Sequence, residues 1–237
     1  IDWNVTARTT TPFVKNFEEE RELTVYLMVD ISASGEFGSG SQLKRELGTE
    51  IAAVLGFSAI KNNDKVGLIL FSDCIEKFIF PKKGKSHVLR VIRELLYTNP
   101  RNTGTSISNS LDYLLKVAKR KSVVFIISDF LDTGYNSSLK IVSKKHDLIA
   151  IQLYDPAEYK FPNIGLAKVE DPETGEMFWI DTTSKRAMKE LQDDIRLKQS
   201  KFSKNAKKIG FDLIPISTDE DFVDPLMSFF KKREKRY

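Results

Sequence analysis

The segment TVYLMVDISAS, residues 24–34, joins an unbroken apolar run to a short polar loop. The run from Val25 to Val29 is too short to span a membrane and shows no polar alternation, which is typical of a central strand in a parallel sheet. A second such run, Val123 to Ile127, ends two residues before Asp129. Because parallel strands end at the same edge of a sheet, and ligands bind at that edge, Asp30 and Asp129 are expected to face one binding site.

Strand-like and helix-like segments alternate along most of the chain. This alternation predicts an α/β fold: a doubly wound, mostly parallel sheet with helices on both faces. One antiparallel edge strand is expected, because the tight turn Ser72-Asp73 separates two apolar runs. The expected strands are 25–29, 66–71, 75–80, 122–128, 148–154 and 211–216, and the expected helices are 43–60, 86–96, 107–118, 137–144, 188–209 and 222–230.

The length of 237 residues fits one α/β domain with appendages. We expect this domain at 23–230, with an inserted hairpin near 165–182 around the turn Asp171-Pro172-Glu173-Thr174-Gly175. Residues 1–22 are expected to form an extended arm and 231–237 a basic tail. The chain begins at Ile1, so we expect an upstream segment in the full-length protein.

Cysteine and charge content narrow the function classes. The single cysteine, Cys74, excludes an internal disulfide, and only His87 and His146 join it as soft metal ligands, too few for structural zinc. With no apolar stretch of about 20 residues, we expect no membrane span in this fragment and a cytoplasmic location.

The net charge of +4 lies entirely in residues 231–237, and residues 1–230 carry 32 basic and 32 acidic side chains. A neutral body is a poor general nucleic-acid binder, so no specific nucleic acid is expected as a partner.

Oxygen-bearing side chains gather on three of the expected loops. Asp30, Ser32 and Ser34 alternate along the first, Thr105 follows Gly104 ahead of a helix, and Asp129 follows a strand. A hard divalent cation takes oxygen ligands and needs only one or two carboxylates. The pattern therefore predicts a shallow Mg²⁺ site with these five ligands, and Mn²⁺ and Ca²⁺ as alternative ions.

The same residues are also compatible with functions other than metal binding. Residues 35–40 are rich in glycine and serine, but no Lys-Ser/Thr pair follows as in a phosphate-binding loop. Asp30 could instead accept a phosphoryl group, although the second acid that such sites place two residues later is here Ser32. The serines could also cap a helix. Neither histidine lies beside a motif serine, so both are read as structural.

The order Asp-x-Ser-x-Ser, loop threonine, later aspartate resembles the metal-ion-dependent adhesion site of von Willebrand factor A domains. Further motifs narrow the resemblance: Ile1-Asp2-Trp3, Ala7-Arg8, Phe17-Glu18-Glu19-Glu20-Arg21, Asp64-Lys65-Val66-Gly67-Leu68, Ser128-Asp129-Phe130, His146-Asp147 and Asp171-Pro172-Glu173-Thr174-Gly175. On these motifs the chain resembles the DUF58 family of von Willebrand factor A-like bacterial proteins. Thr105 is preferred to Thr103 because the family pattern sets the threonine after a glycine and six residues before an apolar helix position, here Leu111.

This resemblance implies a non-enzymatic module that binds an acidic side chain of a protein partner through Mg²⁺. It further implies work alongside a MoxR-type AAA+ ATPase, or its client, in protein assembly or activation. The rival hypothesis is a Mg²⁺-dependent hydrolase or phosphatase that uses the cation as a Lewis acid. A lysine or histidine within hydrogen-bond reach of the site would favour the rival.

Overall fold

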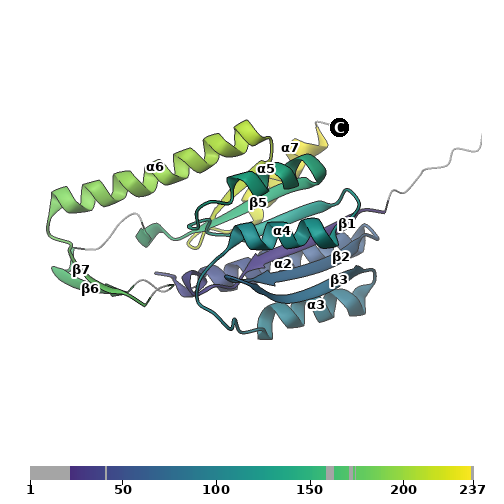
Figure 1. Cartoon of the computed structure of the whole chain (residues 1–237), viewed down its shortest axis with the longest axis horizontal. Helices are drawn as coiled ribbons and strands as arrows, with labels where there is room; N and C mark the ends of the chain where they lie inside the picture. Colours follow the sequence, from purple (N-terminus) through teal and green to yellow (C-terminus); the bar gives the residue numbers. More distant parts are fainter. Residues whose placement is uncertain (1–21, 41, 159–162, 171–172, 174, 236–237) are drawn as a thin grey trace, which may run out of the picture.

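A six-stranded sheet runs through the centre of the computed structural model, which describes residues 22–40, 42–158, 163–170, 173 and 175–235 (Figure 1). The strands lie in the order β3-β2-β1-β4-β5-β8. All neighbours are parallel except β2 and β3, which pair antiparallel. The bounds are β1 Thr24–Asp30, β2 Lys65–Phe71, β3 Ile75–Lys82, β4 Val123–Ser128, β5 Asp147–Tyr154 and β8 Asp212–Ser217. The predicted fold class, including the antiparallel edge strand, is confirmed.

Helices cover both faces of the sheet because side chains alternate along each strand. Val25, Leu27 and Val29 of β1 pack in one core layer with α2, α3 and α7, whereas Tyr26 and Met28 pack in the other with α4, α5 and α6. Figure 1 shows the two helical layers on either side of the strands. The helices are α2 Lys44–Lys61, α3 Lys85–Tyr97, α4 Ile107–Val117, α5 Asn136–Lys145, α6 Lys185–Ile209 and α7 Val223–Glu234.

The register of the two central strands decides where the site forms. β1 and β4 are hydrogen-bonded neighbours, with Val29 opposite Ile127. The strands therefore end together, and Asp30 and Asp129 follow at the same edge. β2 lies on the other side of β1, with Phe71 opposite Asp30, so the turn after β2 reaches this edge as well.

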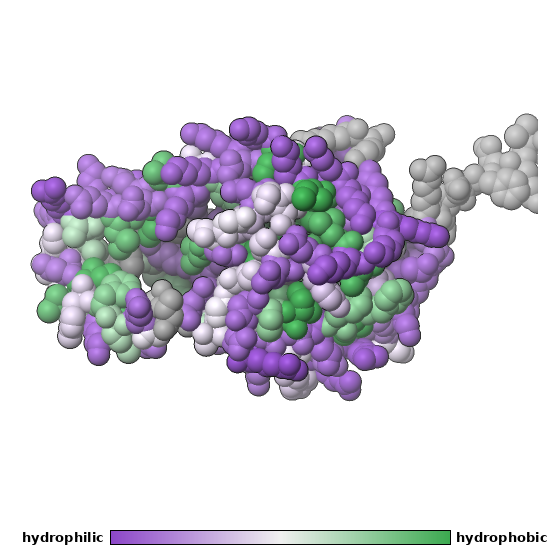
Figure 2. Space-filling model, viewed as in Figure 1, coloured by the Kyte–Doolittle hydropathy of each residue, from purple (hydrophilic) through white to green (hydrophobic). Residues whose placement is uncertain are grey.

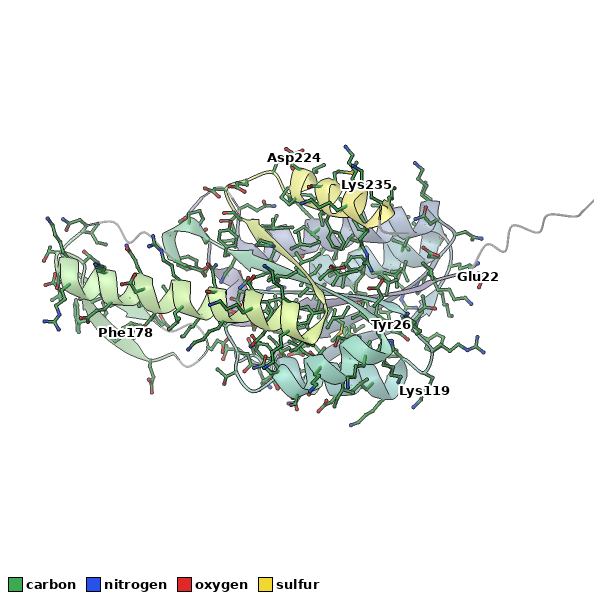
Figure 3. All side chains as sticks on the ribbon, turned by 90° about the horizontal axis from the view of Figure 1, so that it is seen from above. Glu22, Tyr26, Lys119, Phe178, Asp224 and Lys235 are labelled. Atoms are coloured by element: carbon green, nitrogen blue, oxygen red, sulfur yellow. The ribbon has the colours of Figure 1, made fainter. Side chains whose placement is uncertain are left out.

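A separate two-stranded hairpin, β6 Leu166–Glu170 and β7 Met177–Asp181, lies where the inserted hairpin was expected. The 25-residue helix α6 follows, and only Phe202 and Ala206, in its second half, are buried. Figures 1 and 3 show the hairpin and the first half of α6 extending beyond one end of the sheet, with Phe178 of β7 at that end. The hairpin therefore stands apart from the two core layers.

The predicted terminal segments are only partly described. Of residues 1–22, only Glu22 is described, and it forms ion pairs with Lys65 and Lys83. The segment 231–237, expected as a tail, continues helix α7 through Glu234, and Arg233 forms ion pairs with Asp147 and Asp212. Across the described ranges, no helix combines the length and the apolar composition that crossing a bilayer requires.

His146 ends α5 and is buried, and neither ring nitrogen has a hydrogen-bond partner among the described residues. Burial, together with the charge of Lys145, lowers the pKa of this imidazole from 6.5 to about 4. The unfolded chain binds the proton near pH 6.5 and the folded chain only near pH 4, so acid favours unfolding in this window.

Between pH 7 and pH 5, protonation of unfolded His146 lowers the free energy of unfolding of the native protein by about 2 kcal/mol. We predict that His146→Leu abolishes this part of the pH dependence. Urea unfolding at a series of pH values measures this as a shallower pH slope for the variant. Equal slopes for the two proteins over that interval would contradict a neutral, buried His146.

Candidate metal site

Asp30 ends β1 with both carboxylate oxygens engaged. Its Oδ1 accepts the backbone N–H of Ser32 at 3.0 Å, and its Oδ2 accepts the hydroxyl of Ser128 at 2.7 Å. Partial burial and, second, the negative charge of Asp129 raise the pKa of Asp30 from 3.8 to about 7. The Asp30 carboxylate therefore lies in surroundings that favour its neutral form, and a nearby cation would reverse that preference.

The loop after Asp30 buries its two serine hydroxyls. Ser32 and Ser34 are 1% and 6% exposed, and their Oγ atoms lie 3.1 Å apart in a hydrogen bond. A short 3₁₀ helix, Ala33–Glu36, begins within the motif and fixes the second serine. The N–H of Ala33 donates to the carbonyl of Thr103 at 3.0 Å, which ties this loop to the one that carries Thr105.

The backbone turn that follows Asp129 is strained and sets the position of its carboxylate. The next residue, Phe130, has φ of +57°, a left-handed conformation that bulky side chains rarely adopt. Its N–H donates to the Ser128 hydroxyl, and its ring packs 4.6 Å from the ring of Phe202. This packing and hydrogen bonding hold the strained turn, and thereby the Asp129 carboxylate, at the sheet edge.

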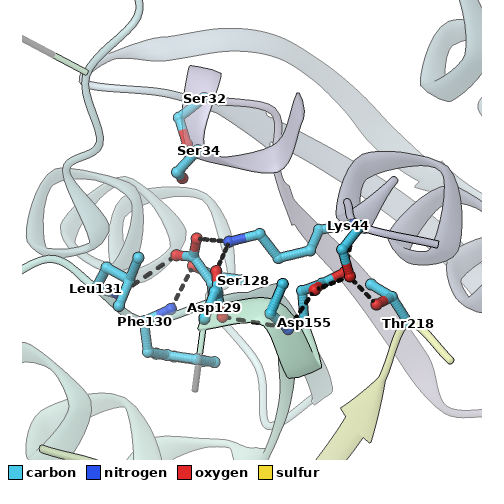
Figure 4. A network of polar contacts seen from close by, with 12 residues as sticks. Ser32, Ser34, Lys44, Ser128, Asp129, Phe130, Leu131, Asp155 and Thr218 are labelled. Atoms are coloured by element: carbon cyan, nitrogen blue, oxygen red, sulfur yellow. Dashed lines mark hydrogen bonds and ion pairs between the residues drawn. The ribbon is translucent and has the colours of Figure 1, made fainter. Parts of the chain in front are cut away.

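Lys44, the first residue of α2, reaches into the site as a buried cation. Its ammonium lies 2.8 Å from Asp129 Oδ2 and 2.7 Å from Glu158 Oε1, and its side chain is 2% exposed (Figure 4). Burial lowers the pKa of Lys44, but the charges of Asp129 and Glu158 raise it by more, so the net pKa is raised. Lys44 is therefore a permanent ammonium beside the candidate metal ligands.

A second buried carboxylate, Asp155, supports the neighbouring loops. It is fully buried after β5 and accepts hydroxyl hydrogen bonds from Ser39 at 2.5 Å and from Thr218 at 2.6 Å. Its own N–H donates to Glu158, the residue that binds Lys44. Figure 4 shows this network beside Asp129. Asp155 therefore fixes the position of the Lys44–Glu158 pair without itself touching the Asp129 carboxylate.

Thr105 lies one residue before Ser106, the N-cap of α4, and therefore belongs to the loop ahead of this helix. The N–H of Ser106 donates to the carbonyl of Ser72, which anchors this loop to the end of β2. The Thr105 hydroxyl donates to the carboxylate of Glu173 at 2.6 Å, and the Thr103 hydroxyl donates to the Glu173 carbonyl at 2.9 Å. Glu173, in the turn of the inserted hairpin, therefore contacts both threonines of the loop.

The donor set fits a hard cation. In an octahedron with metal–oxygen bonds of about 2.1 Å, neighbouring ligands lie about 3.0 Å apart. The Ser32–Ser34 hydroxyl separation of 3.1 Å matches that edge. Within the described ranges, no three His, Cys, Asp or Glu side chains converge as a metal cluster, and hydroxyls make up most of the set.

The structure gathers most of the predicted residues. Hydrogen bonds connect the Asp30 loop to Ser128, the residue before Asp129, and to the Thr103 carbonyl, two residues before Thr105. The role of these five side chains as metal ligands stays a prediction.

Sequence reasoning missed Lys44, Glu158, Asp155 and Glu173, because helix-start lysines and loop acids are most often solvated.

The two predicted structural histidines lie apart from the motif serines. His87 Nε2 is 2.8 Å from the carbonyl of Val66, and His146 is buried at the end of α5. Among the described residues, neither imidazole is hydrogen-bonded to a serine hydroxyl.

Comparison with solved structures supports the fold. The chain is similar to the conserved hypothetical protein BatB of Bacteroides thetaiotaomicron, with a TM-score of 0.55, 14% identity, and coverage of 91% of this chain and 100% of that one. An aerotolerance-related membrane protein from Bacteroides fragilis gives a TM-score of 0.57 at 16% identity, with the same coverage. At these identities the likeness concerns the fold alone.

Sequence comparison extends over nearly the whole chain. Uncharacterized proteins of Mycobacterium tuberculosis and Mycobacterium bovis are 27% identical over 244 residues, which covers 99% of this chain and 75% of each relative. Residues 1–201 match the family described as "Protein of unknown function DUF58". The predicted family is thereby confirmed, and this chain belongs to the DUF58 family.

Proposed function

We propose that this chain is a protein-binding module that captures an acidic side chain of its partner through a divalent cation, Mg²⁺ by preference. The observation that supports this most directly is the cluster of carboxylates and buried hydroxyls at the edge of the sheet. Asp30, Ser32, Ser34, Thr105 and Asp129 are the proposed ligands. When bound, the cation would supply an electrophilic centre with a coordination position for an incoming carboxylate.

Charge balance at the site also supports a divalent ion. When ionised, Asp30, Asp129 and Glu158 together carry three negative charges, and Lys44 supplies one positive charge. The remaining two negative charges equal the charge of one Mg²⁺. If one of the two aspartates acts through a water molecule, the cation stays electrophilic toward a partner's carboxylate, because the hydroxyl ligands add no charge.

The candidate partner is the one that the resemblance to the family implies, a MoxR-type AAA+ ATPase or its client. In that pairing the module would hold an acidic residue of the ATPase or of the client during assembly or activation. Affinity capture with Mg²⁺ present, followed by elution with a chelator, tests the partner's identity and the role of the metal together.

The rival proposal is a Mg²⁺-dependent hydrolase or phosphatase, and one observation favours it. Lys44 lies within hydrogen-bond distance of the candidate ligand Asp129. However, its raised pKa keeps the amine protonated, and an ammonium has no lone pair with which to act as a base. A generic phosphate ester assayed with Mg²⁺ discriminates the two: Mg²⁺-dependent turnover that Asp30→Asn abolishes would favour the hydrolase.

We predict that Mg²⁺ raises the free energy of unfolding of the native chain by about 2.7 kcal/mol when its concentration is 100 times the dissociation constant. Asp30→Asn should abolish this response, because the amide carries no charge for the cation. The variant should stay folded without metal, since the native surroundings already favour a neutral group at Asp30.

Thermal unfolding with and without Mg²⁺ measures the response. Asp147→Asn is the matched control, because Asp147 begins β5 at the opposite edge of the sheet and pairs with Arg233. A native protein indifferent to Mg²⁺, or an Asp30 variant that still responds, would overturn the proposed site.

We also predict that Lys44→Met destabilises the metal-free protein by about 3 kcal/mol, because it leaves the carboxylates of Asp129 and Glu158 without their buried cation. Arg186→Met, which removes an exposed pair with Glu190, should change stability by less than about 0.5 kcal/mol. Urea unfolding measures both. Equal effects of the two substitutions would mean that Lys44 does not stabilise the site.

A further inference from the structure

Glu173 lies in the turn of the β6–β7 hairpin, 68 residues along the chain from Thr105. Its carboxylate oxygen nevertheless lies 2.6 Å from the Thr105 hydroxyl, and its backbone carbonyl accepts the Thr103 hydroxyl. Two contacts, one through the side chain and one through the main chain, therefore place this acid against the loop that carries a proposed metal ligand.

An acid in this position has the chemistry that the proposed site takes from a partner. The Glu173–Thr105 oxygen separation is close to the spacing of about 3.0 Å between neighbouring ligands of one octahedral Mg²⁺. A cation bound to the Thr105 hydroxyl would therefore have the Glu173 carboxylate within reach as a further ligand. No movement of the hairpin is needed to bring the acid to the loop.

We propose that Glu173 is an internal acidic ligand of the metal site and competes with the partner's carboxylate for the same coordination position. This inference rests on the proposed function. A partner must displace Glu173 before it can bind the cation, so the hairpin sets the affinity of the site.

The hairpin is suited to being displaced. Leu166, Met177 and Trp179 alternate onto one face of its two strands and are 65%, 54% and 63% exposed. Figure 2 shows apolar side chains at the surface of this region, beside α6. A segment that buries little apolar area separates from the body at low cost.

The test uses Mn²⁺ as the probe and water-proton relaxation as the readout, which reports both metal affinity and the number of exchangeable waters on the bound ion. Glu173→Gln removes the anionic ligand but keeps an amide oxygen that can accept the Thr105 hydroxyl. We expect about tenfold weaker Mn²⁺ binding and one additional exchangeable water. Glu170→Gln, an exposed acid on strand β6 of the same hairpin, is the control and should match the native protein.

Acetate then serves as a substitute for the partner's carboxylate. In the Glu173→Gln protein loaded with Mn²⁺, acetate should displace the additional water at lower concentrations than it needs in the native or control protein. Unchanged hydration, affinity and acetate response in Glu173→Gln would overturn the internal ligand while leaving the metal site standing. If neither the native nor the Glu170→Gln protein binds Mn²⁺, the proposed function fails and this inference fails with it.

Discussion

Parallel pairing of β1 with β4 is the constraint on which the site depends. It brings two carboxylates, Asp30 and Asp129, to one edge of the sheet, where burial and the negative charge of Asp129 raise the pKa of Asp30. Such an arrangement persists only with compensation. The fold supplies part of it through the Ser128 hydroxyl and the Lys44 ammonium, and the excess negative charge leaves room for a divalent ion.

The surroundings of the site show what that compensation requires of the structure. Phe130 keeps a left-handed backbone that costs about 1–3 kcal/mol, held by the Ser128 hydroxyl and by packing against Phe202. Asp155 is fully buried and collects hydrogen bonds from Ser39 and Thr218. Strain and buried polar groups of this kind are retained where a precise arrangement of side chains matters, which distinguishes this edge from the apolar core beneath it.

The inserted hairpin contributes an acidic side chain to the surroundings of the proposed site. The six-stranded sheet and its loops position the proposed ligands. The separate hairpin β6–β7 brings Glu173 to the loop that carries Thr105. Intramolecular ligands act at high effective concentration, so even a weak carboxylate–metal contact would compete with an external partner. Selectivity for a partner would then depend on how readily that partner separates Glu173 from Thr105 and Thr103.

Local patterns in the sequence determined the elements and the order of the proposed ligands. Apolar runs without alternation identified β1 and β4 as buried parallel strands, and strand ends placed Asp30 and Asp129 at one edge, because both signals are properties of a few adjacent residues. The threonine loop and the hairpin followed from glycine, proline and polar spacing in the same way.

Tertiary structure alone decided which charged residues, far apart in the sequence, meet at the proposed metal site. Lys44 looks like an ordinary residue at the start of a helix, and Glu173 like a solvated acid in a turn, until α2 packs over the sheet and the hairpin folds back to the Thr105 loop. Their roles depend on contacts between residues 68 to 114 positions apart, and no local pattern records such contacts. Local sequence therefore indicated which loops carry the proposed oxygen ligands, and packing decided that Lys44 and Glu173 contact those loops.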